Sequence, residues 1–219
     1  MRNRPLLLGH RGARSTRSIP ENTIASFDLA LQHGCDGFEF DVRLAGDSHA
    51  VICHDPEISG MRVASSAAHD LSLPTLNDVI ARYAESAFLD IELKVSGVEQ
   101  LTVSSLRTRT TLRGVLVSSF LPAILLCLRQ MAGELPLGII CETREQLASW
   151  PELPVQYVIP RRDLITPALV AEIHDRHKRL FAWTVNDPVT MRTLRGWGVD
   201  GIISDETELL VRTLGGDQS

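Results

Sequence analysis

The chain has 219 residues, of which 44% are hydrophobic and 22% are charged, with a formal net charge of −5. This composition is typical of a folded protein with a substantial core. The negative charge argues against a nucleic-acid-binding protein, and no run approaches the ~18 apolar residues of a membrane span. We expect residues 1–219 to form a single domain, because no Pro/Gly/Ser linker or block of charge divides them.

The N-terminal region and the cysteines indicate a cytoplasmic protein. The apolar run at 6–8 is too short for the hydrophobic region of a secretory signal. The four cysteines (Cys35, Cys53, Cys127 and Cys141) lie singly, without the spacing of a zinc site. We therefore expect free and mostly buried thiols in a reducing compartment.

Strand and helix patterns alternate along the chain with short connections. Compact apolar runs predict strands at 6–8, 37–42, 88–93, 115–117, 137–140, 157–159, 181–185 and 201–203. Apolar residues at helical spacing predict helices at 24–34, 76–83, 123–131, 144–150, 167–177 and 188–197, the first of them capped by Asn22 or Thr23. About eight strands that alternate with helices indicate a TIM (β/α)8 barrel. A doubly wound open sheet is the alternative, because it shows the same alternation.

The second predicted strand is followed by a returning arm. Glu39 and Asp41 lie two positions apart, so both carboxylates point to the same side of an extended strand. Gly46-Asp47 predicts a tight turn, after which an apolar run leads back to His54. A turn centred on these two residues pairs Glu39 with His54, and a turn centred one residue later pairs Asp41 with His54. In either register, a β-hairpin after the second strand returns His54 to the two carboxylates.

Acidic side chains stand near the carboxyl ends of the predicted strands, where the active sites of TIM barrels lie. Glu39, Asp41 and Glu92 together offer oxygen ligands for a hard divalent cation such as Mg²⁺ or Ca²⁺. Alternatively, Glu39 and Asp41 form salt bridges with Arg11 or Lys94.

Basic side chains stand at the same strand ends. Arg11 and Lys94 add positive charge that suits a phosphate oxygen. His10 and His54 can exchange protons near neutral pH. A cation site, fixed positive charge and two imidazoles together predict the cleavage of a phosphate ester.

Several short motifs occur in a fixed order. They are His10-Arg11-Gly12, Pro20-Glu21-Asn22-Thr23, Glu39-Phe40-Asp41-Val42, His54-Asp55, Glu92-Leu93-Lys94 and Trp183-Thr184-Val185-Asn186. This ordered set, which lies within residues 8–205, closely resembles the glycerophosphodiester phosphodiesterase family. The resemblance implies a TIM-barrel enzyme that cleaves small-molecule glycerophosphodiesters, such as glycerophosphocholine, to sn-glycerol 3-phosphate and an alcohol, with one divalent cation, Mg²⁺ or Ca²⁺.

The resemblance also implies catalytic and metal-binding residues. His10 and His54 would be the general acid and general base, and Glu39, Asp41 and Glu92 would hold the cation.

Further residues would bind the substrate or support the site. Arg11 and Lys94 would contact the phosphate, and Trp183 would stack on the glycerol. Glu21 would orient Arg11 or His10, or would only help the first helix to begin.

Two segments depart from the family pattern. Between Gly12 and Pro20 the chain carries extra residues, including Arg14 and Arg17. The segment 56–73 is shorter than the usual family insertion and lacks its Arg-Thr-Thr pattern. Because that insertion helps to build the substrate entrance, the departure bears mainly on the size of the accepted substrate.

Two other functions compete with this interpretation. A lysophospholipase D would use the same chemistry on lysophospholipids, but it would require an apolar groove, and the sequence shows no obvious one. A non-catalytic phosphodiester-binding barrel would normally lack a histidine or a carboxylate of the set, whereas this chain has all of them. The sequence does not indicate the preferred alcohol, the choice between Mg²⁺ and Ca²⁺, or the oligomeric state.

Overall fold

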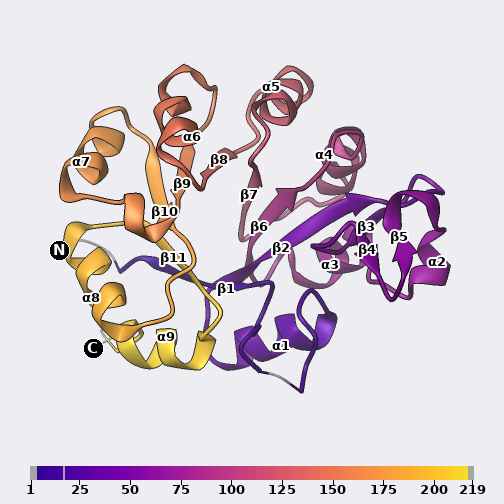
Figure 1. Ribbon diagram of the computed structural model, residues 1–219, viewed down its shortest axis with the longest axis horizontal. Coiled ribbons are helices and arrows are strands. Elements are labelled where there is room, and N and C mark those ends of the chain that lie inside the picture. Colours follow the sequence, from indigo (N-terminus) through magenta and orange to yellow (C-terminus); the bar gives the residue numbers. More distant parts are fainter. Residues whose placement is uncertain (1–3, 17, 217–219) are drawn as a thin grey trace.

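Parallel strands alternate with helices throughout the computed structural model, which describes residues 4–16 and 18–216. Within these residues, the parallel strands are β1 (Leu6–His10), β2 (Gly37–Leu44), β6 (Phe88–Leu93), β7 (Gly114–Ser119), β8 (Leu137–Cys141), β9 (Tyr157–Pro160), β10 (Arg179–Ala182) and β11 (Gly201–Ser204). They pair in this order, and β1 also pairs with β11, so the sheet closes into a barrel with helices around it (Figure 1). The predicted TIM (β/α)8 barrel is confirmed, and the open-sheet alternative is wrong.

The helices that follow the strands are α1 (Ile24–Gln32), α3 (Leu76–Tyr83), α4 (Glu99–Arg107), α5 (Pro122–Met131), α6 (Arg144–Ala148), α7 (Pro167–Asp175), α8 (Pro188–Trp197) and α9 (Thr207–Leu214). The sequence prediction missed α4 and α9. Both helices begin after a residue whose side chain makes no capping bond, Val98 and Glu206. By contrast, the side chains of Thr23, Thr75 and Asp187 cap α1, α3 and α8, and such caps are visible in a sequence. Where the prediction placed ends at 150 and 185, α6 and β10 end earlier, at Ala148 and Ala182.

Apolar side chains on the two faces of the strands form two separate layers. The outer layer lies between strands and helices and includes Phe27, which stacks on Phe38 with ring centroids 4.2 Å apart. The inner layer fills the interior of the barrel up to the floor of the pocket described below and is made by Leu8, Phe88, Leu116, Ile140, Tyr157, Ile159, Phe181 and Ile203. Gly201 leaves room for this filling, because a Cβ there would lie 2.6 Å from the Phe181 ring. Apolar side chains therefore block the interior of the barrel, and polar side chains that point inward gather near the carboxyl ends of the strands.

The hairpin after β2 has a different register from either of the two predicted ones. In the returning strand β3 (Ala50–Ile52), Ile52 pairs with Val42 and Ala50 pairs with Leu44. The loop spans residues 45–49 rather than a two-residue turn, and it is closed by the Ala45 N–H, which donates to the His49 carbonyl at 2.8 Å. The last cross-strand hydrogen bond runs from the Cys53 N–H to the Asp41 carbonyl at 3.0 Å, and His54 then reaches the barrel mouth through a bend in the chain.

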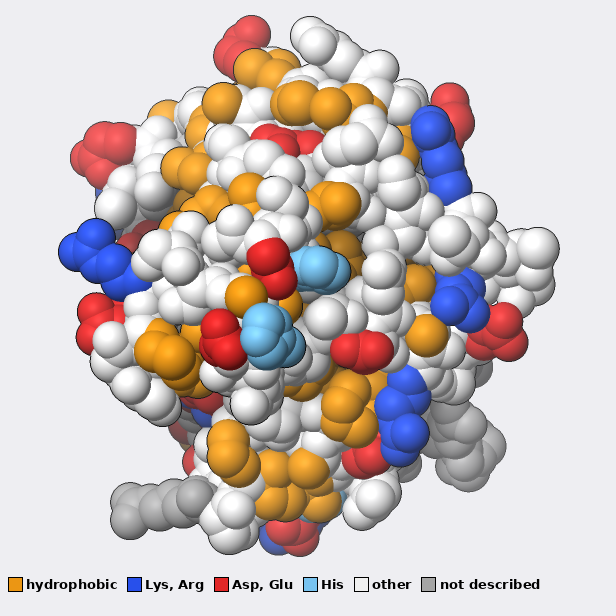
Figure 2. Space-filling view, turned by 90° about the vertical axis from the view of Figure 1, so that its right-hand side faces the viewer, with side chains coloured by type: hydrophobic (Ala, Val, Ile, Leu, Met, Phe, Trp, Pro, Cys, Tyr) orange, Lys and Arg blue, Asp and Glu red, His pale blue; other side chains and the backbone are white. Residues whose placement is uncertain are grey.

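The segment 56–73 forms a small lobe at one side of the barrel (Figure 1), which we call the insertion lobe. It contains β4 (Glu57–Ile58), β5 (Met61–Arg62) and α2 (Ala68–Leu71), and it packs on β3 through its own apolar cluster. From this side of the molecule, histidine and acidic side chains lie next to one another on the surface (Figure 2). Among the described residues, no helix is both long and apolar enough to cross a membrane.

Candidate active site

His10, the last residue of β1, is held from both sides of its ring. Its Nδ1 lies 2.7 Å from the Asp205 carboxylate, and its Nε2 lies 3.9 Å from Glu39 Oε2. Asp205 follows β11 directly and also accepts a hydrogen bond from the Asn186 side chain at 2.7 Å. Burial raises the pKa of Asp205, but its bonds to His10 and Asn186 and the charges of His10 and Arg14 outweigh this and lower it to about 2. The sequence prediction did not name Asp205 as a site residue.

The turn after β1 aims Arg11 at the carboxylates. Arg11 has a positive φ of 54°, and its backbone N–H donates to Glu39 Oε2 at 3.0 Å. Its guanidinium contacts Asp41 at 3.2 Å and Glu21 at 2.7 Å. The tightness of the turn explains the glycine at position 12, where φ is +82° and a Cβ would lie 2.5 Å from Ser26 Oγ. The structure thus brings Glu21 into contact with Arg11, which the first of the two predicted alternatives for this residue requires.

The carboxylates of Glu39 and Asp41, within β2, and of Glu92, near the end of β6, form a buried cluster. One oxygen from each lies within 4.8 Å of the others. One buried oxygen of each residue (Glu39 Oε1, Asp41 Oδ1 and Glu92 Oε1) has no hydrogen-bond partner among the described residues, although Glu92 Oε1 and Asp41 Oδ1 lie 2.6 Å and 3.4 Å from the Lys94 ammonium as ion pairs. The salt-bridge alternative is therefore present for Asp41, yet an unpartnered oxygen remains. Converging carboxylate oxygens of this kind fit a hard divalent cation.

The cluster is electrostatically strained as it stands. Burial and the neighbouring charges of Asp41 and Glu92 raise the pKa of Glu39 well above its usual value. Burial and Asp41 raise the pKa of Glu92 to about 7. Asp41 itself is buried, but Lys94 and Arg11 lower its pKa. A bound cation would relieve the repulsion and release protons from Glu39 and Glu92.

Asn22 supports the cluster from the loop before α1. Its side-chain amide donates to Asp41 Oδ2 at 2.8 Å, and its own backbone has a positive φ of 57°. The cap of α1 is Thr23, so the predicted alternative of an Asn22 cap is wrong. The Pro-Glu-Asn-Thr motif contained the signal for this residue, but only the fold shows that it binds Asp41.

Asp90 is a further acidic residue that the sequence prediction missed. It lies two residues before Glu92 on β6 and is 1% exposed. Its Oδ1 accepts a hydrogen bond from the Ser118 hydroxyl at 2.6 Å, whereas its Oδ2 has no partner among the described residues. Burial raises its pKa to about 7, although the Ser118 bond opposes this. A signal was available, because Asp90 alternates with Glu92 and must share its face of the strand.

His54 approaches the cluster from the bend after β3. Arg43 fixes this bend by donating from Nε to the His54 carbonyl at 2.7 Å. The His54 Nδ1 lies 2.7 Å from the Asp55 carboxylate, and its side chain is 33% exposed. Burial lowers the pKa of His54, and the positive charges of Lys94 and Arg11 add to this, while Asp41 and Asp55 oppose it.

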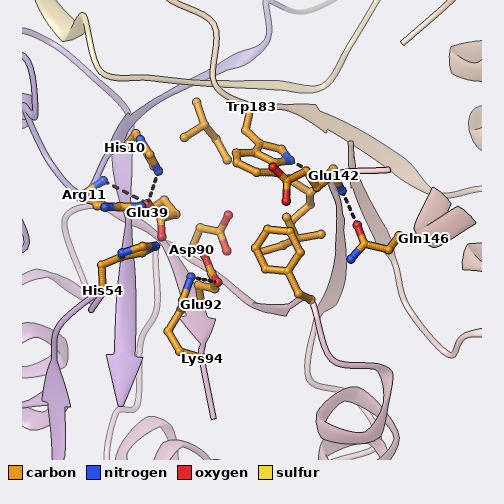
Figure 3. A pocket seen from close by; sticks show the side chains of 14 residues that line it. His10, Arg11, Glu39, His54, Asp90, Glu92, Lys94, Glu142, Gln146 and Trp183 are labelled. Atoms are coloured by element: carbon orange, nitrogen blue, oxygen red, sulfur yellow. Dashed lines mark hydrogen bonds and ion pairs between the residues drawn. The ribbon is translucent and has the colours of Figure 1, made fainter. Parts of the chain in front are cut away.

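One pocket of about 390 Å³ at the barrel mouth is lined by most of these residues, namely His10, Arg11, Glu39, His54, Asp90, Glu92 and Lys94. Figure 3 shows His10, Arg11, Glu39, His54, Glu92 and Lys94 on one side and Trp183, Glu142 and Gln146 on the other. The Trp183 indole donates to the Ile159 carbonyl at 2.9 Å and meets the Phe120 ring edge-on at 5.5 Å. Asp41 and Glu21 do not line this pocket themselves. Arg14 and Arg17 belong to the extra residues between Gly12 and Pro20. Arg14 forms ion pairs with Glu21 and Asp205, whereas Arg17 lies outside the described residues.

Known proteins of similar sequence match nearly the whole chain. A glycerophosphodiester phosphodiesterase of Caldanaerobacter subterraneus subsp. tengcongensis is 29% identical over 235 residues, which cover 94% of this chain and 96% of the relative. A glycerophosphodiester phosphodiesterase of Bacillus subtilis is 24% identical over 253 residues, covering 94% and 85%.

Solved structures agree with this match. A glycerophosphodiester phosphodiesterase from Parabacteroides distasonis has a TM-score of 0.87 at 23% identity and covers 100% of both chains, which supports the fold. A phosphodiesterase from Oleispira antarctica, solved in complex with the product sn-glycerol-3-phosphate, has a TM-score of 0.83 at 25% identity and covers 96% of each chain. The sequence profile of the glycerophosphoryl diester phosphodiesterase family matches residues 10–90 and 73–209, and the chain therefore belongs to this family.

Proposed function

We propose that this protein hydrolyses glycerophosphodiesters to sn-glycerol 3-phosphate and an alcohol, with one divalent cation, Mg²⁺ or Ca²⁺. The observation that carries the proposal is the position of two carboxylate-bound histidines beside the Glu39–Asp41–Glu92 cluster in one pocket. Membership of the family supports the reaction, and the product found in the Oleispira antarctica phosphodiesterase supports the direction of cleavage.

Glu39, Asp41 and Glu92 would hold the cation, because their oxygens converge and are buried. A cation bound there would polarise the phosphate oxygens and offset their charge. Arg11 and Lys94 line the same wall, where each could bind a phosphate oxygen directly. These two residues would orient the phosphodiester between the histidines.

His10 and His54 would move the protons. A carboxylate can only accept, so the Nδ1 of each ring carries a proton towards Asp205 or Asp55 and leaves Nε2 for the reaction. One Nε2 would take the proton of the attacking hydroxyl, and the other would give a proton to the leaving alcohol. The family resemblance implies that the attacker is the glycerol 2-hydroxyl and that water then opens the cyclic phosphate.

A substrate panel tests this function. We expect release of sn-glycerol 3-phosphate from glycerophosphocholine and glycerophosphoethanolamine with Mg²⁺ or Ca²⁺, and none with chelator. Lysophosphatidylcholine belongs in the same panel, because its cleavage in preference to the deacylated diesters would show a lysophospholipase D instead. Binding of glycerophosphocholine without turnover under all metal conditions would show a non-catalytic barrel.

Metal removal gives an independent prediction about the cluster. Divalent cation should raise the melting temperature of the wild type, because binding to the folded state alone stabilises it. Asp41→Asn should weaken this shift and lower activity, whereas Glu85→Gln, a change of the same kind at an exposed position, should alter neither. Equal thermal stability with and without metal, combined with chelator-resistant turnover, would contradict the cation site.

A further inference from the structure

Asp90 presents an unpartnered polar atom to the pocket. Its side chain is 1% exposed, and its Oδ2 has no hydrogen-bond partner among the described residues. A buried carboxylate oxygen without a partner is costly, so native proteins usually satisfy it with another group. The residue lines the pocket, which means that a bound molecule can supply this partner.

The position of Asp90 along β6 sets its depth in the pocket. Phe88, Asp90 and Glu92 alternate along the strand and so share its interior face. Phe88 belongs to the apolar filling of the barrel, and Glu92 belongs to the carboxylate cluster at the mouth. Asp90 therefore lies between the apolar floor and the cluster.

The surroundings of Asp90 select the kind of partner. Ile140, Ile159 and Ile203 line the same pocket, and all of them belong to the apolar filling. Asp90 does not belong to the group of converging oxygens that could hold a cation. The free oxygen can accept a hydrogen bond, and the apolar side chains of the floor favour an uncharged group. A hydroxyl at the end of a short carbon chain meets both conditions.

We propose that Asp90 accepts a hydrogen bond from the terminal hydroxyl of the substrate's glycerol and is the residue that selects for an unmodified glycerol end. This inference rests on the proposed function, because it places the phosphate at the cation cluster and the glycerol 2-hydroxyl beside it. The terminal hydroxyl is then one carbon further along the chain, towards the floor. An acyl group on that oxygen would remove the donor and would meet the closed floor, so lysophospholipids acylated there would be rejected. The Trp183 side of the pocket is left for the alcohol, in place of the predicted stacking on glycerol.

A substrate analogue without the terminal hydroxyl tests the proposal. The phosphocholine diester of propane-1,2-diol keeps the 2-hydroxyl and lacks only the group that Asp90 would bind. We expect the wild type to prefer glycerophosphocholine over this analogue by about 10²-fold or more in kcat/KM, because a site built to bind a hydroxyl discriminates strongly against its absence. In Asp90→Ala the preference should fall below about tenfold, through loss of activity on glycerophosphocholine. Asp90→Asn keeps the shape of the side chain and an oxygen for the Ser118 hydroxyl, so it should disturb folding least. Its preference for glycerophosphocholine should lie between that of the wild type and that of Asp90→Ala.

Controls separate this role from the alternatives. Ile140→Val changes the same pocket without a polar atom and should keep the wild-type preference. Metal affinity, measured by calorimetry, should be unchanged in both Asp90 variants. Equal loss on the two substrates in Asp90→Ala, a wild type without preference, or loss of metal affinity would each overturn the proposal.

Binding of products distinguishes a failure here from a failure of the proposed function. The wild type should bind sn-glycerol 3-phosphate more tightly than the phosphate monoester of propane-1,2-diol, and Asp90→Ala should bind the two alike. If no diester is hydrolysed but this difference is found, the assignment of Asp90 stands and the proposed reaction fails. If diesters are hydrolysed and the difference is absent, the assignment of Asp90 fails.

Discussion

His10 and His54 each pair with a carboxylate at 2.7 Å, yet the two pairs are built in opposite ways. The side chains of His10 and Asp205 are 10% and 18% exposed, and the two residues come from opposite ends of the chain. Those of His54 and Asp55 are 33% and 73% exposed, and the two residues are neighbours in the sequence. The same contact is thus a product of barrel closure in one pair and of a local bend in the other.

The difference in burial has an energetic consequence. A charge-assisted hydrogen bond that is shielded from water holds its partners more firmly than an exposed one, which solvent and salt weaken. Asp205 is fixed in turn by Asn186 and Arg14, whereas Asp55 faces solvent. We therefore expect the buried carboxylate to matter for catalysis and the exposed one to matter little, although both rings are needed.

The largest effect should come from removal of either ring. His10→Ala and His54→Ala should each reduce kcat/KM on glycerophosphocholine by about 10²–10⁴-fold, the usual contribution of one positioned proton-transfer group. The double variant should lose much less than the product of the two, because the pair acts as a unit. His69→Ala, which removes an exposed histidine of the insertion lobe, is the control.

A nitrophenyl diester then assigns the two roles. The variant that lacks the leaving-group acid should recover on this substrate, because nitrophenolate leaves without protonation. Recovery of neither variant, or near-wild-type activity of both on glycerophosphocholine, would contradict the acid–base pair.

An intermediate effect should separate the two carboxylates. Asp205→Asn should lower kcat by about 10–10²-fold, as expected when a partner that orients a functional imidazole is lost. Asp55→Asn should cost less than about fivefold, because exposed ion pairs contribute about 1 kcal/mol or less. Steady-state kinetics at saturating metal measure both, with melting temperatures to verify folding. Equal losses in the two variants would show that burial does not distinguish the pairs.

The smallest effect concerns pH and the stability of the metal-free protein. The pKa of His54 is lower in the folded protein than its usual value of 6.5, mainly through burial. As the pH falls, His54 is therefore protonated in the unfolded chain before it is protonated in the folded protein. The free energy of unfolding should then decrease between pH 6.5 and the lower pKa of the folded state. Denaturant unfolding in chelator should therefore show a shallower decline below pH 6.5 in His54→Gln than in the wild type. Identical slopes would mean that the pKa of His54 is not lowered in the folded state.

Local features of the fold and site could be predicted because each depends on residues close together in the chain. The strand at 88–93 has the same bounds in the structure, and the cap at Thr23 is visible as a motif. Helices α4 and α9 were missed, and neither has a side-chain cap or a proline in its first turn to mark where it begins. The hairpin register was wrong by one residue, since a five-residue loop closed by backbone bonds replaces the expected tight turn.

The sequence alone determined the alternation of strands and helices and the residue types at the strand ends, because hydrophobic period and motif order are properties of neighbouring residues. Only the tertiary structure decided which of those residues meet. Barrel closure brings β11 beside β1, and so Asp205 beside His10 across 195 positions of sequence. The packing of β6 against its neighbours buries Asp90 and leaves one of its oxygens in the pocket without a partner from the part of the chain that the structure describes. Such contacts depend on which strands distant in sequence become neighbours in the barrel, and no single stretch of sequence specifies that.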